Sequence, residues 1–147
     1  MTVTIRDARP TDEKEWRRLW ADYLAFYDTT ISDEITDATW RRIHDPASAI
    51  FMRVAEVEGR MVGFALCITH EGTWVKDLDC YLEDLFVDES QRGLGLGRAL
   101  LDDLVDLSKQ NGWARLYWHT SVDNHRARKL YDQYVKTDDH IRYRIEF

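Results

Sequence analysis

The spacing of apolar residues changes several times along the chain, and each change marks a predicted element. Val3 and Ile5 alternate with polar neighbours, which is typical of a short strand. Asp12 follows, and Glu15 lies three residues later as in a capping box, so a helix is predicted to begin here. Aromatic residues and leucines then recur at helical spacing, at Trp16, Leu19, Trp20, Tyr23, Leu24 and Tyr27. This spacing predicts a helix of roughly four turns whose apolar face belongs to the core or to the wall of a substrate site.

The next part of the chain carries the signals of one short helix and three strands. Residues 37–44 are predicted to be helical, because their apolar side chains share one face and an Asp-Pro pair follows. Residues 49–57 and 61–69 are rich in β-forming side chains, and Gly59 between them suits a tight hairpin. These two strands are therefore expected to pair antiparallel. Residues 81–87 predict a further strand, which two adjacent acids interrupt.

The C-terminal third begins with a leucine-rich helix. Over residues 96–111 leucines lie on one face and acids on the other, and Gly112 ends the pattern. Residues 113–119 read as a strand and residues 124–134 as a helix. Residues 140–147 alternate apolar and polar side chains, which predicts a closing strand.

The predicted elements follow the order strand, helix, helix, three strands, helix, strand, helix, strand. This order is typical of an α/β protein with a mixed sheet. A chain of 147 residues without repeats, low-complexity tracts or linkers fits one domain, over residues 1–147.

Composition and charge narrow the classes of function. The chain is 44% hydrophobic and 32% charged, which is typical of a soluble protein, and no apolar run could span a membrane. The N-terminus lacks the features of a secretory signal, so a cytoplasmic location is expected. A net charge of −7 disfavours nucleic acid and favours a cationic small molecule as partner. Cys67 and Cys80 lie within predicted strands and are expected to be buried thiols, and the scattered histidines predict no metal site.

A glycine-rich segment between a predicted strand and a helix is the strongest candidate for ligand binding. Gly93, Gly95 and Gly97 follow Arg92, and a loop of this kind before a helix N-terminus can hold phosphate groups. The dinucleotide fingerprint fails, because Leu100 stands where its third glycine belongs. The alternative is a tight strand-to-helix turn without a ligand.

Several motifs resemble those of the GNAT superfamily of N-acetyltransferases. Residues 92–97 fit its pyrophosphate signature Q/R-x-x-G-x-G/A, and residues 124–131 are similar to its N-x-x-A-x-x-x-Y helix. Residues 83–87 and 5–12 look like the strand before the signature and the opening strand of the family. The strand looks closest to diamine acetyltransferases, and the helix is closer to small enzymes that acetylate histones, polyamines or D-amino acids. One departure is the absence of the family's usual glycine soon after Tyr131.

The resemblance implies the GNAT fold, acetyl-CoA as cofactor and a homodimer. It also implies that the sheet splays between its fourth and fifth strands. The strand holding Glu83 then carries a β-bulge, and Leu85 and Val87 pair with the pantetheine of coenzyme A. The cofactor contacts that it implies are Leu85, Phe86, Val87, Arg92, Gly93, Leu94, Gly95, Leu96, Gly97, Arg98, Asn124, Arg126 and Tyr131.

Acetyl transfer to an amine requires a base, because the amine is protonated at neutral pH. Glu83 is the predicted base, and Tyr131 is by resemblance the acid that protonates the departing thiolate. Asp84, with Trp20 and Tyr23 as walls, is predicted to bind the substrate and to favour acceptors with a second positive charge, such as polyamines or lysine-like molecules. Direct transfer in a ternary complex is expected. In a regular strand Glu83 and Asp84 would face opposite sides, so both reach one substrate only if a bulge breaks the pleat.

Other interpretations stay open. The two acids can be an exposed patch or a structural pair, and Tyr131 can be an ordinary core residue. The acceptor can instead be an amino acid or the lysine of a peptide. A domain that binds acyl-CoA without turnover is the alternative of a different class.

Overall fold

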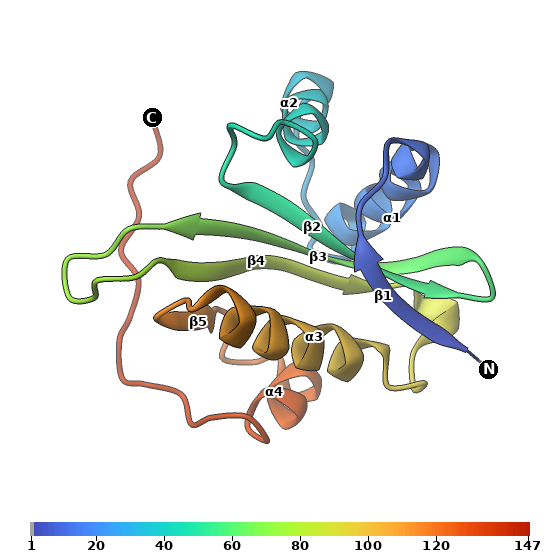
Figure 1. Cartoon of the computed structure of the whole chain (residues 1–147). Helices are drawn as coiled ribbons and strands as arrows, with labels where there is room; N and C mark the ends of the chain where they lie inside the picture. The colour runs from blue at the N-terminus through green and yellow to red at the C-terminus, as the bar shows by residue number, and fades with distance from the viewer. Residues whose placement is uncertain (1) are drawn as a thin grey trace.

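The computed structural model describes residues 2–147 as a five-stranded sheet covered by helices on both faces (Figure 1). Its elements are β1 (Val3–Asp7), the 3-10 turn η1 (Pro10–Asp12), α1 (Glu13–Phe26), α2 (Asp33–Ile43), β2 (Ile50–Val57), β3 (Arg60–His70), β4 (Asp79–Val87), the 3-10 turn η2 (Glu89–Gln91), α3 (Leu96–Asn111), β5 (Arg115–Trp118) and α4 (His125–Tyr131). No helix within residues 2–147 combines the length and the apolar character needed to cross a membrane.

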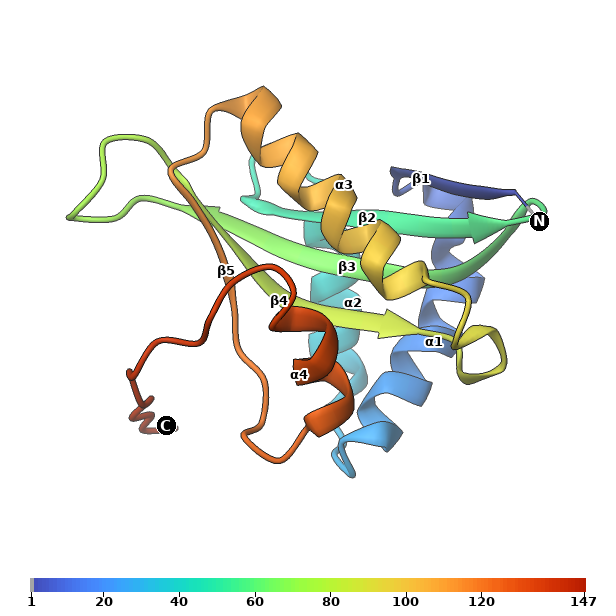
Figure 2. The same ribbon diagram turned by 90° about the horizontal axis from the view of Figure 1, so that it is seen from below.

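The strands lie side by side in chain order, β1 to β5. The first four pair antiparallel, and β5 runs parallel to β4, which confirms the predicted mixed sheet. The predicted hairpin joins β2 to β3, and both turn residues, Glu58 (φ 52°) and Gly59 (φ 77°), have the positive φ of a two-residue hairpin. Helices α1 and α2 cover one face of the sheet, and α3 and α4 cover the other (Figures 1 and 2).

The sheet separates two buried clusters of apolar side chains. Under α1 and α2 the cluster is aromatic, with Trp16 stacked between Trp20 (5.4 Å between ring centroids) and Trp40 (5.2 Å). Under α3 it is aliphatic and includes Leu100, Leu101, Leu104 and both free cysteines, Cys67 and Cys80. The periodic residues of the sequence therefore build the core as their spacing predicted.

Strand β4 is irregular at the place where the sequence has two acids. Asp84 lies opposite Leu66 and Leu82 lies opposite Cys67, so Glu83 is the extra residue of a β-bulge. Pairing with β5 covers only the first four residues of β4, from Asp79 to Leu82. Beyond Leu82 the two strands separate, as the resemblance implied.

Several boundaries and one cap differ from the predicted ones. Strand β4 begins at Asp79 rather than at residue 81, and β5 covers Arg115–Trp118 rather than residues 113–119. Helix α2 begins at Asp33 rather than at residue 37, because the Ser32 hydroxyl accepts a hydrogen bond from the backbone of Ile35 and caps it earlier. Asp12 does not form a capping box with Glu15, since its carboxylate accepts instead from the Arg9 backbone at 2.7 Å and from the guanidinium of Arg6. Helix α4 ends at Tyr131 rather than at residue 134.

The prediction of a closing strand over residues 140–147 is wrong for the single chain. Residues 140–147 form no strand, and none of their backbone groups pairs with another backbone group of residues 2–147. The four apolar side chains are largely exposed, at 77% for Ile141, 88% for Tyr143, 80% for Ile145 and fully for Phe147. Alternation identifies side chains that can be buried together, but it does not supply the neighbouring strand that would bury them.

Candidate functional site

A cleft of about 330 Å³ lies where β4 separates from β5. Elements far apart in the sequence form its walls: the end of α1, the second half of β4, the loop before α3 with the first turn of that helix, and α4. The predicted site residues that line it are Tyr23, Leu85, Phe86, Val87, Arg92, Gly93, Gly95, Leu96, Gly97, Arg98, Asn124, Arg126 and Tyr131.

The glycine-rich loop meets the cleft through backbone that only glycine adopts easily. Gly93 (φ 84°) and Gly95 (φ 75°) have positive φ, and Gly95 is the N-cap of α3. Gly97 has no such requirement, since a Cβ added there would make an ordinary van der Waals contact with Leu130 of α4 at 3.5 Å. The first N–H groups of α3 have no acceptor within the helix, and the helix dipole makes this end of the cleft attractive to phosphate.

Basic side chains border the same end of the cleft. The guanidinium of Arg92 lies over the rings of Phe26 (5.3 Å) and Phe86 (5.7 Å). Arg98 donates a hydrogen bond to the side chain of Gln133 on the other side of the cleft mouth. Leu94, which the resemblance placed among the cofactor contacts, is 45% exposed and does not line the cleft.

The free edge of β4 forms the floor of the cleft. Leu85 and Val87 lie beyond the last residue paired with β5, so their backbone groups on that side have no strand partner among residues 2–147. An extended ligand with amide groups can pair with such an edge. On the facing wall Asn124 caps α4, since its side chain accepts a hydrogen bond from the backbone of Ala127 at 3.3 Å.

A half-buried carboxyl group, that of Asp84, lies beside the cleft, next to the lining residues Tyr23 and Leu85 but not itself part of the lining. Asp84 points toward α1, and the Tyr23 hydroxyl donates a hydrogen bond of 2.8 Å to it. Burial raises the pKa of Asp84 to about 7, the hydrogen bond from Tyr23 lowers it, and the charge of Glu83 raises it further. The same burial, with the nearby carboxylate, raises the pKa of Tyr23.

Two further tyrosines connect this carboxyl group to α4. The ring of Tyr27 lies 5.1 Å from that of Tyr23, and the pKa of Tyr27 is raised by burial and then by Asp84. Burial also raises the pKa of Tyr131 to about 12, with a smaller contribution from Tyr27. Trp118 of β5 contacts the Tyr131 ring edge-on at 5.5 Å. The structure thus gathers Asp84, Tyr27 and Tyr131 at one place.

The structure separates the two acids that the sequence places side by side. Glu83 is exposed and does not line the cleft, although its charge raises the pKa of both Asp84 and Tyr23. The two acids thus differ in exposure rather than in their distance along the strand, because Asp84 is half-buried and Glu83 is exposed.

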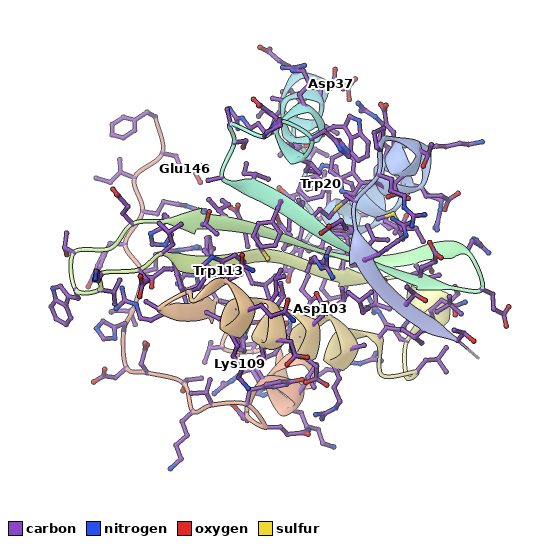
Figure 3. All side chains as sticks on the ribbon, in the orientation of Figure 1. Trp20, Asp37, Asp103, Lys109, Trp113 and Glu146 are labelled. Atoms are coloured by element: carbon purple, nitrogen blue, oxygen red, sulfur yellow. The ribbon has the colours of Figure 1, made fainter. Side chains whose placement is uncertain are left out.

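Trp20 is not part of the site wall. It is 8% exposed and lies between α1 and the sheet (Figure 3), and its indole N–H donates to the Thr36 hydroxyl at 3.2 Å. Its ring stacks on that of Tyr23 at 5.5 Å. Helical spacing could not separate these residues, because Trp20 and Tyr23 share one face of α1 and only the position of β4 decides which one reaches the cleft.

Five lining residues were not named as site residues from the sequence: Phe26, Tyr27, Gln91, Ala127 and Leu130. Tyr27 was available as the last member of the aromatic series, and Ala127 lies inside the motif of residues 124–131. Phe26 carried no signal, because it lies off the periodic face of its helix and reaches the cleft only where α1 ends.

Comparison with known proteins agrees with this geometry. The model of the acetyltransferase (GNAT) family matches residues 12–135. The chain is 31% identical to the D-amino-acid N-acetyltransferase HPA3 of Saccharomyces cerevisiae over 144 residues, which are 97% of this chain and 89% of that protein. It is 32% identical to the N-acetyltransferase YhfO of Bacillus subtilis over 133 residues, 89% of this chain and 87% of that one.

Solved structures show the same fold. A ribosomal-protein-alanine N-acetyltransferase from Brucella melitensis biovar Abortus 2308 superposes with a TM-score of 0.83 at 25% identity, over the whole of both chains. The structure of AAC(6')-Iy with a coenzyme A bisubstrate analogue gives the same TM-score at 21% identity, again over both whole chains. With a family match that covers the loop, β4 and α4, and with a cleft built from those elements, the chain belongs to the acetyltransferase (GNAT) family.

Proposed function

We propose that this acetyl-CoA-dependent N-acetyltransferase acetylates a primary amine of a small acceptor that carries a second positive charge, such as a polyamine or a lysine-like molecule. The observation that carries the proposal is the environment of Asp84. Its carboxyl group is half-buried beside the cleft, bonded to the lining residue Tyr23, and no Lys, Arg or His side chain of residues 2–147 pairs with it. A buried carboxylate without a cation is unfavourable, so a cationic ligand stabilises this site.

The residues present fit acetyl-CoA. The glycine loop and the start of α3 suit a pyrophosphate, and the free edge at Leu85 and Val87 suits the amides of a pantetheine arm. When bound, acetyl-CoA supplies a thioester whose carbonyl carbon accepts the amine nitrogen. The new C–N bond replaces the C–S bond, the amine loses a proton and the departing sulfur carries the electron pair.

Asp84 is the residue proposed to take the proton from the amine. A base works best when its pKa lies near the operating pH, and a pKa of about 7 meets this condition. The sequence suggested Glu83 as the base and Asp84 as the residue that binds the acceptor, and the geometry favours the reverse assignment. Glu83, exposed beside the cleft, attracts the distal positive charge of the acceptor, while the Tyr23 hydroxyl keeps the Asp84 carboxylate oriented.

Tyr131 is proposed to act on the departing sulfur as a hydrogen-bond donor. Its pKa of about 12 keeps it protonated throughout the physiological range. Complete transfer of its proton to a thiolate, whose thiol has a pKa of roughly 8.5, is uphill by about 3 to 4 pKa units. A hydrogen bond that strengthens as negative charge develops avoids this cost.

An amino acid is the second candidate acceptor, because the relative from Saccharomyces cerevisiae is a D-amino-acid N-acetyltransferase. The carboxylate of an amino acid would approach Asp84 and Glu83, which repel it. A cationic acceptor meets no such repulsion, so the charges of the site favour the first candidate.

The test is the release of coenzyme A thiol with a panel of acceptors: a diamine, a polyamine, a lysine peptide, a neutral monoamine of similar length and both enantiomers of several amino acids. We expect the diamine and polyamine to have kcat/KM values roughly tenfold or more above the monoamine. An amino acid without a second cation as the best acceptor would contradict the proposed substrate class while leaving N-acetyl transfer intact.

Acetyl-CoA binding, measured separately from turnover, tests the phosphate loop with a pair of matched variants. Gly95→Asp places a side chain and a negative charge in the phosphate loop, so acetyl-CoA binding should weaken by about tenfold or more. Gly59→Asp, in the β2–β3 hairpin at a similar φ of 77°, controls for backbone strain and should leave binding unchanged. Tight binding by the wild type with no thiol release for any amine would indicate a silent acyl-CoA-binding domain.

A further inference from the structure

The face of the sheet that carries Asp84 also carries a pair of stacked tyrosines. Tyr81 of β4 and Tyr117 of β5 are partners in the parallel pairing, and their rings stack at 4.9 Å with 15° between the planes. Their neighbours along both strands pack in the aliphatic cluster under α3. The two tyrosines therefore face the opposite side of the sheet, the side on which Asp84 meets Tyr23 of α1.

Hydrogen bonds hold the two rings in place. The Tyr117 hydroxyl lies 2.6 Å from Nε2 of His70, whose Nδ1 lies 2.7 Å from the backbone carbonyl oxygen of Glu71. Because a carbonyl oxygen only accepts, Nδ1 carries the proton of the neutral imidazole, and Nε2 accepts from Tyr117. Nδ1 of His119 lies 3.3 Å from the Tyr81 hydroxyl, and the two rings meet edge-on at 5.4 Å. The stacked tyrosines thus form a preorganised surface.

One face of the Tyr81 ring is left for a ligand. Tyr117 covers the other face from the β5 side, so the remaining face is turned toward β3, where the paired residue is the aliphatic Ile68. Tyr81 and Ile68 are both half-buried, so part of this surface is open to solvent. The cation–π contacts within residues 2–147 involve Arg92 and Arg98, so no cation of the described chain lies on the Tyr81 ring.

Negative charge lies next to this ring face. Burial raises the pKa of Tyr81, and the charge of Glu83, two residues further along β4 and exposed, raises it again. Besides burial, the same carboxylate contributes to the raised pKa of Asp84 and of Tyr23, so it lies between the ring and the proposed base. Arg142 lowers the Tyr81 pKa, but it is exposed and makes no cation–π contact with the ring. A ring quadrupole beside a carboxylate selects a positively charged group.

We propose that Tyr81 and Glu83 form the subsite for the distal cation of the acceptor, with the cation against the free face of the Tyr81 ring and Tyr117 supporting that ring from behind. The inference rests on the proposed function, because it takes Asp84 as the base at the reacting amine. Asp84 follows Tyr81 by three residues of a bulged strand, which sets the two nitrogen atoms of the acceptor about 7 to 10 Å apart. An extended spacer of about five to seven methylene groups covers this distance.

An aromatic face recognises a cation differently from a site made of hydrogen-bond acceptors. A ring attracts a quaternary ammonium group, which has no N–H to donate, through charge alone. A site that relies on hydrogen bonds loses its contacts with the same group. The subsite is therefore expected to accept a distal trimethylammonium group as well as a primary ammonium group, at the same distance from the reacting amine.

The first experiment compares two acceptors of the same shape that differ in charge, 6-aminohexyltrimethylammonium and its neutral isostere 7,7-dimethyloctylamine. The wild-type kcat/KM for the cation should exceed that for the isostere by roughly tenfold or more. Tyr81→Ala should reduce this ratio by about fivefold or more, and Glu83→Gln should reduce it as well, whereas Tyr81→Phe keeps the ring and should hold it within about twofold. An unchanged ratio in Tyr81→Ala would overturn the inference.

The control for the loss of a ring is Phe51→Ala. Phe51 packs on Trp113 at 5.6 Å on the α3 side of the sheet, so its removal should leave the charge ratio unchanged. Acetyl-CoA binding and thermal unfolding of each variant show that it is folded. A ratio that falls equally in Phe51→Ala and Tyr81→Ala would mean that the effect comes from general loosening of the sheet, which would also overturn the inference.

The second experiment separates this inference from the proposed function, with primary diamines of increasing spacer length. The wild type should have its highest kcat/KM at about five to seven methylene groups, and Tyr81→Ala should flatten this optimum. If the wild type does not prefer diamines to monoamines, the proposed substrate class is wrong and the subsite with it. If the wild type prefers diamines and Tyr81→Ala keeps both the preference and the optimum, the proposed function stands and the subsite is wrong.

Discussion

A buried carboxyl group, Asp79, and a half-buried one, Asp84, lie five residues apart on β4, and their surroundings give them opposite properties. Asp79, 2% exposed, receives a forked set of hydrogen bonds from Arg115 at 2.6 to 3.0 Å, and this guanidinium holds its pKa below the ordinary value. Asp84 has only the Tyr23 hydroxyl, and burial raises its pKa to about 7. The same strand thus holds one carboxylate with its cation and one without.

The difference follows from where β4 has a neighbour. Asp79 lies opposite Arg115 in the parallel pairing with β5, so the chain supplies the counter-charge. Asp84 lies beyond the bulge, where β5 has separated, and among residues 2–147 its side chain accepts from the Tyr23 hydroxyl of α1 and pairs with no cation. A carboxyl group that the fold leaves without a cation is a candidate for binding one from outside, whereas a satisfied pair serves the fold.

The largest expected effect separates the two residues by activity. Asp84→Asn should lower kcat/KM for a diamine by roughly 10²- to 10³-fold, because it removes the proposed base. Asp79→Asn, the matched change in the satisfied pair, should lower it less than about threefold once corrected for folded protein. Steady-state kinetics on both variants checks this. Equal losses would show that Asp84 has no special role.

The pH dependence of kcat/KM should report the pKa of the Asp84 carboxyl group. Acceptor amines with a pKa near 10 stay protonated below pH 9, so they do not titrate in this window. The rate should fall tenfold per pH unit below about 7, as Asp84 becomes protonated. A profile that stays flat down to pH 5 would rule out Asp84 as the base.

Stability should respond to the two residues with opposite signs. The pKa of Asp84 is raised from 3.8 to about 7, so its contribution to stability is lost as the pH rises through this window. Asp84→Asn should therefore raise Tm at pH 8 by a few degrees, on the order of 4 °C, and the gain should vanish below pH 4. Thermal unfolding at both pH values measures it. A loss of stability at pH 8 would mean that Asp84 has a partner in the fold.

The pKa of Asp79 is lowered, so its contribution is present above 3.8 and is lost as the pH falls below that value. Asp79→Asn should lower Tm at pH 7, on the order of 5 °C, because Arg115 loses its partner. Near pH 2 wild type and variant should converge. If Asp79→Asn is as stable as the wild type at pH 7, the Asp79–Arg115 pair does not stabilise the fold.

The smallest effect concerns the hydroxyl that holds Asp84. Tyr23→Phe removes a hydrogen bond that lowers the Asp84 pKa, so the midpoint of the pH profile should rise by roughly half a unit to one unit. Tyr117→Phe removes a hydroxyl that bonds His70 instead and serves as control. If the midpoint of the pH profile does not move in Tyr23→Phe, the group that titrates in the profile is not Asp84.

Much of the fold and of the site could be predicted from the sequence, because local chemistry determines those parts. Periodic apolar residues set the helices, the turn residues Glu58 and Gly59 set the hairpin, and the glycines at 93 and 95 occupy positive φ in the loop. The loop, the β4 floor and the α4 wall all line the cleft as the motifs implied. Each of these features depends on neighbours within a few residues, which is what a sequence records directly.

Tertiary structure alone decided the features that depend on which segments meet. The sequence shows Glu83 and Asp84 as equals, and only the bulge, with α1 packed beside it, leaves Asp84 half-buried and Glu83 exposed. Trp20 and Tyr23 share a helix face, and only the position of β4 assigns one to the core. Residues 140–147 have the alternation of a strand, yet pairing requires an edge that the rest of the chain does not bring to them. Spacing fixes the face on which a side chain lies, and the neighbours of that face come from packing over long sequence distances.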